Sequence, residues 1–209
     1  MTIKDQITEQ AIEMFMKSGI RAITMDDIAG RVGVSKRTLY ENFRDKDDLI
    51  RNCLEQLDNK FNRQYKELLE NSENTIYLSF NIIILGIKAL NEINPLFFEE
   101  LKKYHYRVWS EVHRVNLKKQ KAMLVTILKK GINQKVFRPN ISIDVVVTLM
   151  MEQLRLIHEK SLFPESKFPR QIVFENVFIN FFRGIATQKG LDLIEGFLEK
   201  ESAHFITVR

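Results

Sequence analysis

Turn-forming residues and cysteine are scarce in this sequence. Among 209 residues there are 8 Gly, 4 Pro and 1 Cys. So few Gly and Pro argue against an all-β or low-complexity chain, because either would need many turns. The single cysteine, Cys53, excludes an internal disulfide framework and suits a reducing compartment.

Long hydrophobic runs and a secretion leader are also missing. The most apolar run, residues 76–90, is interrupted by Ser79, Asn81 and Lys88. It is too short and too polar to cross a bilayer. No basic segment followed by an apolar one begins at Met1, so we expect no secretion. These features predict a cytoplasmic protein with no membrane partner.

Signatures of catalysis and of metal binding are absent as well. The sequence contains no G-x-S-x-G, no H-E-x-x-H and no glycine-rich phosphate loop. Cys53 falls on an apolar helical position, and His158 has no evident partner. We therefore expect no enzyme, no cofactor and no metal site. A helical enzyme or ligand carrier with an incidental motif is kept as one alternative.

The chain is basic overall, but the surplus lies away from its amino-terminal part. The net charge is +5. Residues 1–50 contain 8 Lys and Arg against 9 Asp and Glu, whereas residues 102–135 contain 10 against 1. An argument for nucleic-acid binding therefore depends on local placement. The basic run 102–135 is interpreted as a solvated face, and attraction of DNA or of an acidic ligand by its field is the alternative.

Apolar residues recur at helical spacing along the chain, which predicts an all-α fold of nine to ten helices. Near the carboxyl terminus of a long stretch, Lys130 and Gly131 predict a helix end. The helices are expected over residues 2–18, two short segments within 24–43, 46–70, 75–93, 95–130 with a break near 104–107, 143–161, 169–188 and 191–200.

Residues 24–46 read as two short helices, a tight turn between them and the start of a longer helix. Thr24 is placed to cap the first helix, and Asp27 completes a capping box. Gly33 supplies the positive φ at which that helix ends. Ser35 caps the second helix. The segment is therefore predicted to be a helix-turn-helix.

The second short helix buries Leu39 and Phe43, which lie four residues apart. A helix of about two turns is unstable alone, so it must lean on its neighbours and leave one face free. In a helix-turn-helix this face enters the major groove of DNA. The outward residues are Lys36, Arg37, Thr38, Tyr40, Glu41 and Asn42.

This stretch closely resembles the DNA-binding motif of the TetR family of bacterial transcription regulators. Arg37 stands where many members have glycine, so base preference does not transfer. The resemblance is specific over residues 7–50, and beyond them it extends to length and helix order only. The matching residues are Thr24, Asp27-Ile28-Ala29, Gly33-Val34-Ser35, Thr38-Leu39-Tyr40, Phe43 and Lys46-Asp47-Asp48-Leu49.

The resemblance and the residue chemistry together predict the DNA contacts. Thr24, Tyr40 and Lys46 are expected to bind phosphates, since Thr24 and Lys46 stand at helix amino termini. The expected base readers at the start of the recognition helix are Lys36, Arg37 and Thr38, because arginine favours guanine. Asn42 is a further candidate, although its place near the helix end also suits a cap.

The resemblance implies a DNA-binding domain over residues 1–46 and a helical regulatory and dimerisation domain over 47–209, joined through the helix at 46–70. The helices at 143–161 and 169–188 are apolar around most of their circumference, which favours a homodimer over two simple core helices. The predicted interface residues are Val146, Met150, Leu154, Ile157, Phe174, Val177, Phe178, Phe181 and Phe182.

The middle helices carry aromatic and methionine residues that suit an apolar cavity for a small effector. Ordinary core packing is the alternative for each of them. The expected function is a transcriptional repressor that an apolar or aromatic ligand releases from a palindromic operator, and the alternative is a constitutive dimeric DNA-binding protein without a ligand. The candidate effector residues are Tyr65, Phe80, Ile84, Phe97, Tyr104, Trp109, His113, Met123 and Met150.

Overall fold

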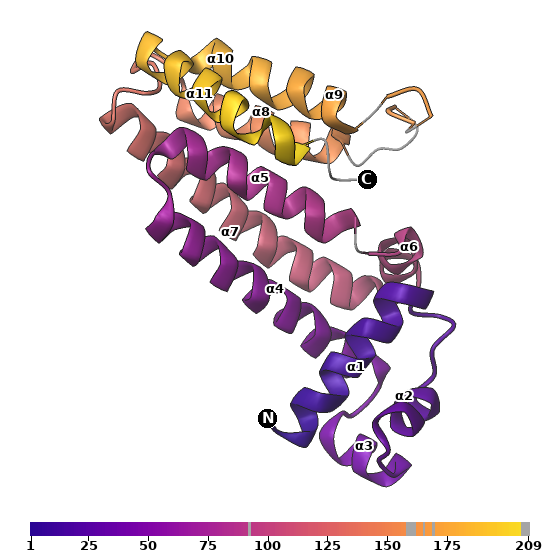
Figure 1. Cartoon of the computed structure of the whole chain (residues 1–209). Helices are drawn as coiled ribbons and strands as arrows, with labels where there is room; N and C mark the ends of the chain where they lie inside the picture. Colours follow the sequence, from indigo (N-terminus) through magenta and orange to yellow (C-terminus); the bar gives the residue numbers. More distant parts are fainter. Residues whose placement is uncertain (92, 158–161, 165, 169, 206–209) are drawn as a thin grey trace. The chain divides into compact units, whose positions relative to one another are not determined.

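The structure is a computed structural model that describes residues 1–91, 93–157, 162–164, 166–168 and 170–205. Over these ranges the chain is all-α, as predicted, and it forms ten helices when α9, η1 and α10 are counted as one. The elements are α1 (Ile3–Ser18), α2 (Met25–Val32), α3 (Lys36–Asn42), α4 (Lys46–Asn71), α5 (Thr75–Asn91), α6 (Pro95–Tyr104), α7 (Tyr106–Asn133), α8 (Ile143–Ile157), α9 (Arg170–Phe174), η1 (Glu175–Ile179), α10 (Asn180–Ile185) and α11 (Gln188–Phe205) (Figure 1).

The chain packs as two units. Unit 1 comprises Met1–Glu70 and Ile82–Leu117, and unit 2 comprises Asn71–Asn81 and Lys118–Arg209. The packing therefore does not divide at residue 46. The boundary predicted at residue 46 concerned function, namely where the DNA-binding domain ends, and it stays a prediction.

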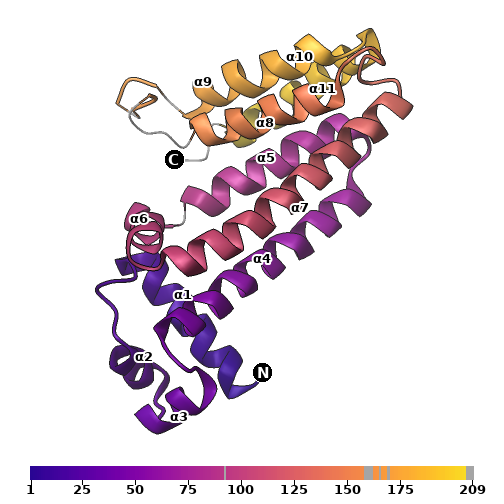
Figure 2. The ribbon, with the colours of Figure 1, turned by 180° about the vertical axis from the view of Figure 1, so that it is seen from behind.

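The core of unit 1 extends beyond the three amino-terminal helices. Helix α4 adds Cys53, whose thiol has a pKa raised by burial, and α6 adds Phe97 and Leu101. In both views α3 lies at one end of unit 1, and α6 lies beside the far end of α1 (Figures 1 and 2). The buried residues that α1, α2 and α3 contribute to this shared core are Ile7, Ala11, Phe15, Met25, Ile28, Ala29 and Leu39.

The break between α6 and α7 falls where it was predicted. Helix α6 ends at Tyr104, and His105 leaves the helical region with φ −126° and ψ 39° before α7 begins. The His105 ring also holds the first turn of α4, since its Nδ1 lies 2.5 Å from Asp47 Oδ1. A tertiary contact thus accompanies a break that neither proline nor glycine marks.

The predicted end of α7 at Gly131 is wrong, because the helix continues to Asn133. Gly131 has a packing role instead. A Cβ atom at this position would lie 2.2 Å from Phe137 Cδ2. The glycine lets the loop after α7 fold back closely against the helix.

Unit 2 departs from the predicted bounds in its last two helices, while the predicted end of α8 is not described. Helix α8 is described to Ile157, and residues 158–161 of the predicted helix lie outside the described residues. The helix predicted over 169–188 is α9, η1 and α10, and it stops at Ile185 because extended Ala186 bridges to Phe137. Residue 169 is likewise not described. Helix α11 is longer than predicted: it begins at Gln188, before residue 191, and ends at Phe205, after residue 200 (Figure 2).

An aromatic cluster forms the centre of unit 2. The Phe80 ring of α5 lies 6.3 Å from that of Phe174, 5.1 Å from that of Phe182 and 5.0 Å from that of Phe197. These rings join α5, α9, α10 and α11 into one core. Among the described residues, no helix is both long enough and apolar enough to cross a membrane.

Candidate DNA-binding surface

Side-chain caps fix the starts of α2 and α3. Thr24 Oγ1 accepts the Asp27 N–H at 3.1 Å, and the Asp27 carboxylate accepts the Thr24 N–H at 2.8 Å. Hydrogen bonds from the Thr24 hydroxyl and main chain hold the pKa of the Asp27 carboxyl below its usual range. Gly33 adopts φ 77° and ψ 29°, and Ser35 Oγ accepts the Thr38 N–H at 3.0 Å. The predicted capping box, turn and second cap are confirmed.

Helix α3 buries one side and exposes the other. Leu39 is fully buried, and Phe43 directly after the helix is 1% exposed. On the opposite side Tyr40 is 46% exposed, and the Arg37 side chain is 88% exposed. The predicted orientation of these four side chains is confirmed.

The two leading cations of α3 are exposed and held by ion pairs. Lys36 Nζ lies 2.9 Å from Asp26 Oδ2, which raises the pKa of Lys36. Arg37 Nε lies 2.9 Å from Glu41 Oε1, one helical turn further on. Exposed pairs of this kind contribute little to stability, so both cations are available to another anion.

Thr38 and Asn42 are bonded within α3 and are half-buried. The Thr38 hydroxyl lies 2.8 Å from that of Ser35. Asn42 Nδ2 donates to the Thr38 carbonyl at 2.8 Å. Asn42 therefore holds the last turn of the helix, which was the alternative to a base contact.

Lys46 differs from the other cations of the motif. Its ammonium group donates to the carbonyls of Ile20 at 2.6 Å and Ile23 at 2.5 Å, and it lies 5.8 Å from the centroid of the Phe15 ring. Burial lowers the pKa of Lys46. The phosphate role predicted for this residue therefore competes with contacts inside the motif.

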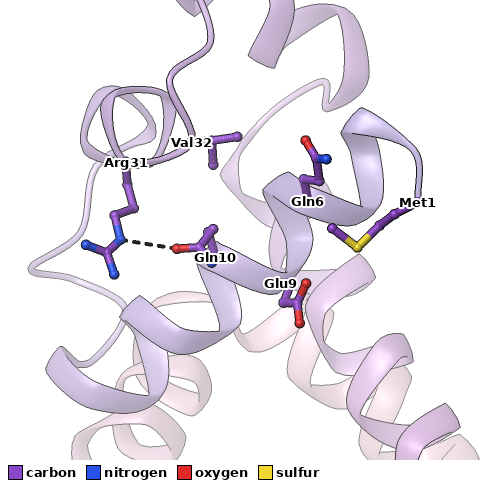
Figure 3. A pocket seen from close by; sticks show the side chains of 6 residues that line it. All are labelled: Met1, Gln6, Glu9, Gln10, Arg31 and Val32. Carbon is purple, nitrogen blue, oxygen red and sulfur yellow. Dashed lines mark hydrogen bonds between the residues drawn. The ribbon is translucent and has the colours of Figure 1, made fainter.

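A recess of about 240 Å³ opens between the start of α1 and the end of α2. Figure 3 shows Arg31 donating to Gln10 across it, with an Nε to Oε1 distance of 3.1 Å. None of the predicted DNA-binding or effector residues lines this recess. The recess forms where two helices distant in sequence meet, so the local sequence pattern did not indicate it. The lining residues are Met1, Gln6, Glu9, Gln10, Arg31 and Val32.

Three predicted effector residues of unit 1 belong to one aromatic group. Phe97 is buried, and the Phe98 ring lies 5.2 Å from its ring and 6.5 Å from that of Trp109. Trp109 stacks on His113 with centroids 4.4 Å apart and planes inclined by 16°. Burial, assisted by the charge of Lys102, lowers the pKa of His113. The structure thus brings Phe97, Trp109 and His113 together.

The other candidates of unit 1 lie in different environments. Tyr104 is 48% exposed, and its hydroxyl accepts a hydrogen bond from Arg21 Nη1 at 3.4 Å. Tyr65 and Ile84 are half-buried, and burial raises the pKa of Tyr65. Tyr104 therefore belongs to the surface beside the amino-terminal helices.

Three candidates belong to unit 2. Phe80 and Met150 are buried, and Met123 is half-buried. Phe80 lies at the centre of the aromatic cluster described above. Its contacts are those of a core residue, which was the alternative for each candidate.

The residues predicted at a dimer interface are distributed between core and surface. Those buried within the single chain are Val146, Met150, Phe174, Phe178 and Phe182. Val177 and Phe181 are half-buried, and the side chains of Leu154 and Ile157 lie outside the described part of the chain. Among the described side chains of α8 and α9, the exposed large apolar ones are Val145, Leu149 and Ile172.

Comparison with known proteins agrees with the geometry of the motif. A family model for bacterial regulatory proteins of the tetR family matches residues 7–53. The chain is also 24% identical over 188 residues to the helix-turn-helix transcriptional regulator YvaF of Bacillus subtilis, covering 90% of this chain and 97% of YvaF. Residues 7–53 are therefore a TetR-family segment, and over the longer alignment the likeness to YvaF is 24% identity.

Proteins of the TetR family share the fold of this chain. The repressor KstR2 of Mycolicibacterium smegmatis is 25% identical over 147 residues, or 68% of this chain and 71% of KstR2. A solved TetR-family regulator from Agrobacterium tumefaciens has a TM-score of 0.67 at 19% identity, covering 88% of this chain and 97% of that one. For the ketosteroid regulator KstR2 of Mycobacterium tuberculosis the TM-score is 0.56 at 21% identity, covering 90% and 96%.

The family match over residues 7–53 assigns roles to the elements already described. Helices α2 and α3 are the helix-turn-helix, and the protein is a DNA-binding transcription regulator. This class of protein is distinct from the enzymes.

Proposed function

We propose that the protein is a cytoplasmic, homodimeric repressor without enzymatic activity, which binds a palindromic operator and is released from it by a small apolar or aromatic molecule. The exposed polar face of α3 carries this proposal, because Arg37 and Tyr40 are free of the core while Leu39 holds the helix to it. The KstR2 relatives are repressors, which supports repression over activation.

In this proposal the exposed side chains divide into two groups. Lys36, Arg37 and Thr38 begin the recognition helix and read base edges in the major groove. Thr24 and Tyr40 contact phosphates, which set orientation and carry no sequence information. Asn42 is left with a minor part, because its amide already bonds the Thr38 carbonyl.

Dimerisation gives such a short helix the affinity that it needs. One module buries little surface, and two symmetric modules roughly double the free energy of binding. Their recognition helices must match major grooves about 34–36 Å apart, or a multiple of that distance. The exposed Val145, Leu149 and Ile172 are the side chains that we assign to first contact with a second copy.

The effector would act by binding two arrangements of the protein unequally. We assign it the aromatic group of Trp109 and His113 in unit 1, where an apolar surface meets a polar ring nitrogen. Two solved regulators of this fold are named for ketosteroids and for fatty acid degradation. Steroids and fatty acyl compounds are therefore the first probes. A constitutive dimer without a ligand is the competing function.

The first test is a gel shift with the DNA upstream of the protein's own gene. We expect a shifted band that competitor DNA of unrelated sequence does not remove. Because phosphate contacts release counterions, affinity should fall steeply between about 50 and 200 mM salt. Equal affinity for unrelated DNA would contradict sequence-specific binding.

The second test separates the regulated repressor from the constitutive dimer. Native mass spectrometry of the purified protein should show a bound small molecule, and adding excess of that molecule should abolish the gel shift. Binding that survives every steroid and fatty acyl probe, in a protein that carries no ligand, would favour the constitutive alternative.

A further inference from the structure

The turn between α1 and α2 is held by side chains from two other helices of unit 1. Residue Asn94, which precedes α6, caps the end of α1. Its main-chain N–H donates to the Met16 carbonyl at 2.9 Å, and its Nδ2 donates to the Lys17 carbonyl at 2.9 Å. The turn that follows therefore begins from a fixed point.

Lys46 binds the carbonyl side of this turn. Two of its three ammonium hydrogens are used by Ile20 and Ile23. The Ile23 carbonyl directly precedes Thr24, the cap of α2. Lys46 is also the first residue of α4, which starts soon after α3 ends. One side chain thus ties the entrance of the helix-turn-helix to its exit.

Glu100 of α6 binds the amide side of the same turn. Its Oε2 accepts the Arg21 N–H at 2.7 Å. The carboxylate fits because residue 19 is glycine, at φ 80°: a Cβ atom there would lie 2.8 Å from Glu100 Oε2. The turn is thus held by the Lys46 ammonium group, which binds two of its carbonyls, and by the Glu100 carboxylate, which binds one of its amides.

We propose that Lys46 is a positioning residue for DNA binding, which fixes the start of α2 and so the placement of α3, and is not a phosphate ligand. This inference rests on the proposed function. Turning the ammonium group away toward a phosphate would leave the Ile20 and Ile23 carbonyls without this donor, and breaking such charge-assisted, part-buried bonds is costly. The exposed Lys36 has no comparable tie to the main chain.

The salt dependence of operator binding distinguishes the two roles. Each phosphate contact contributes about 0.9 to the slope of log affinity against log salt concentration. For Lys46→Met, which keeps an apolar stem, we expect about a tenfold loss of affinity at every salt concentration with the wild-type slope. The matched control is Lys36→Met, which removes an exposed cation from the start of the recognition helix. A cation held in the groove between the phosphates also displaces counterions, so its loss should lower the slope.

Glu100→Met provides a second variant, since it removes both the acidic charge and the oxygen that accepts the Arg21 N–H. Removing an acidic charge should tighten DNA binding if only the field matters. If Glu100 instead positions the turn, affinity should fall and the slope should stay unchanged. This variant also tests whether the contacts with the turn matter for DNA binding if Lys46→Met fails to fold. Tighter binding by Glu100→Met would overturn the proposal.

Hydrogen exchange without DNA measures the turn directly. The amides of Arg21 and Ile23 are bonded in the turn, and they should exchange at least tenfold faster in Lys46→Met than in wild type or Lys36→Met. A slope lowered by Lys46→Met as much as by Lys36→Met, or an unchanged exchange rate, would overturn the positioning role. If wild-type protein binds no DNA, the proposed function fails, while the exchange rates still decide whether Lys46 holds the turn.

Discussion

Arg37 is the residue whose replacement should change DNA preference without changing the fold. Its side chain is 88% exposed and, within the described part of the chain, is ion-paired with Glu41 alone. Arg37→Ala should therefore alter the free energy of unfolding by less than about 0.5 kcal/mol. Loss of a bidentate contact to guanine should relax discrimination at one base pair by about 1–3 kcal/mol. Binding to a set of operators, each substituted at one position, measures this effect.

The matched control for Arg37→Ala is Glu41→Ala, which frees the guanidinium and should leave base preference intact. Unchanged specificity in Arg37→Ala would remove this residue from the base readers. At this scale the caps at Thr24 and Ser35 were predictable because their partners lie three residues away. The contact of Lys46 with Ile20 was not, because 26 residues separate them.

At the scale of one helix, Gly131 tests whether close packing or helix propensity decides stability. Alanine inside a helix normally gains about 0.5–1 kcal/mol over glycine. In Gly131→Ala the new Cβ would lie 2.2 Å from the Phe137 ring, so we expect a net loss of about 1–3 kcal/mol from overpacking. Urea unfolding measures both effects.

Gly86→Ala is the control for this prediction. Gly86 lies inside α5, and a Cβ atom there meets nothing within 4 Å. This variant should therefore gain stability while Gly131→Ala loses it. If both variants gain alike, the close approach of Phe137 is contradicted.

The misjudged helix ends share the physical cause seen at Gly131. Lys130 and Gly131 are a local signal for a helix end, but a contact with Phe137 uses the glycine differently. The end of α10 at Ile185 likewise depends on the bridge between Ala186 and Phe137, which are 49 residues apart in the sequence. Local patterns predicted where helices exist, and distant contacts decided where several of them end.

For the whole molecule, hydrophobic pattern predicted the all-α class but could not separate core from partner surface. Phe178 and Phe182 were predicted at a dimer interface because their helix is apolar on most sides, yet both are buried within the single chain. The Phe182 ring packs on Phe80, about a hundred residues earlier. The spacing of apolar residues does not show whether the same chain or a second copy covers a helix face. Because Phe178 is buried within the single chain, Phe178→Asp would destabilise unit 2 itself.

Leu149 offers a sharper test of the proposed dimer than any buried residue. It lies on α8 and is 47% exposed, so Leu149→Asp should keep the monomer fold while placing a carboxylate in the interface with Val145 and Ile172. We expect sedimentation velocity to show monomers, and operator affinity to fall because each molecule then reads one half-site. Val115→Asp, on α7 of unit 1, changes a side chain of equal exposure, 47%, and should remain dimeric. A dimer that survives in Leu149→Asp would place the partner surface elsewhere, and monomers in both variants would show that any added exposed charge disrupts assembly.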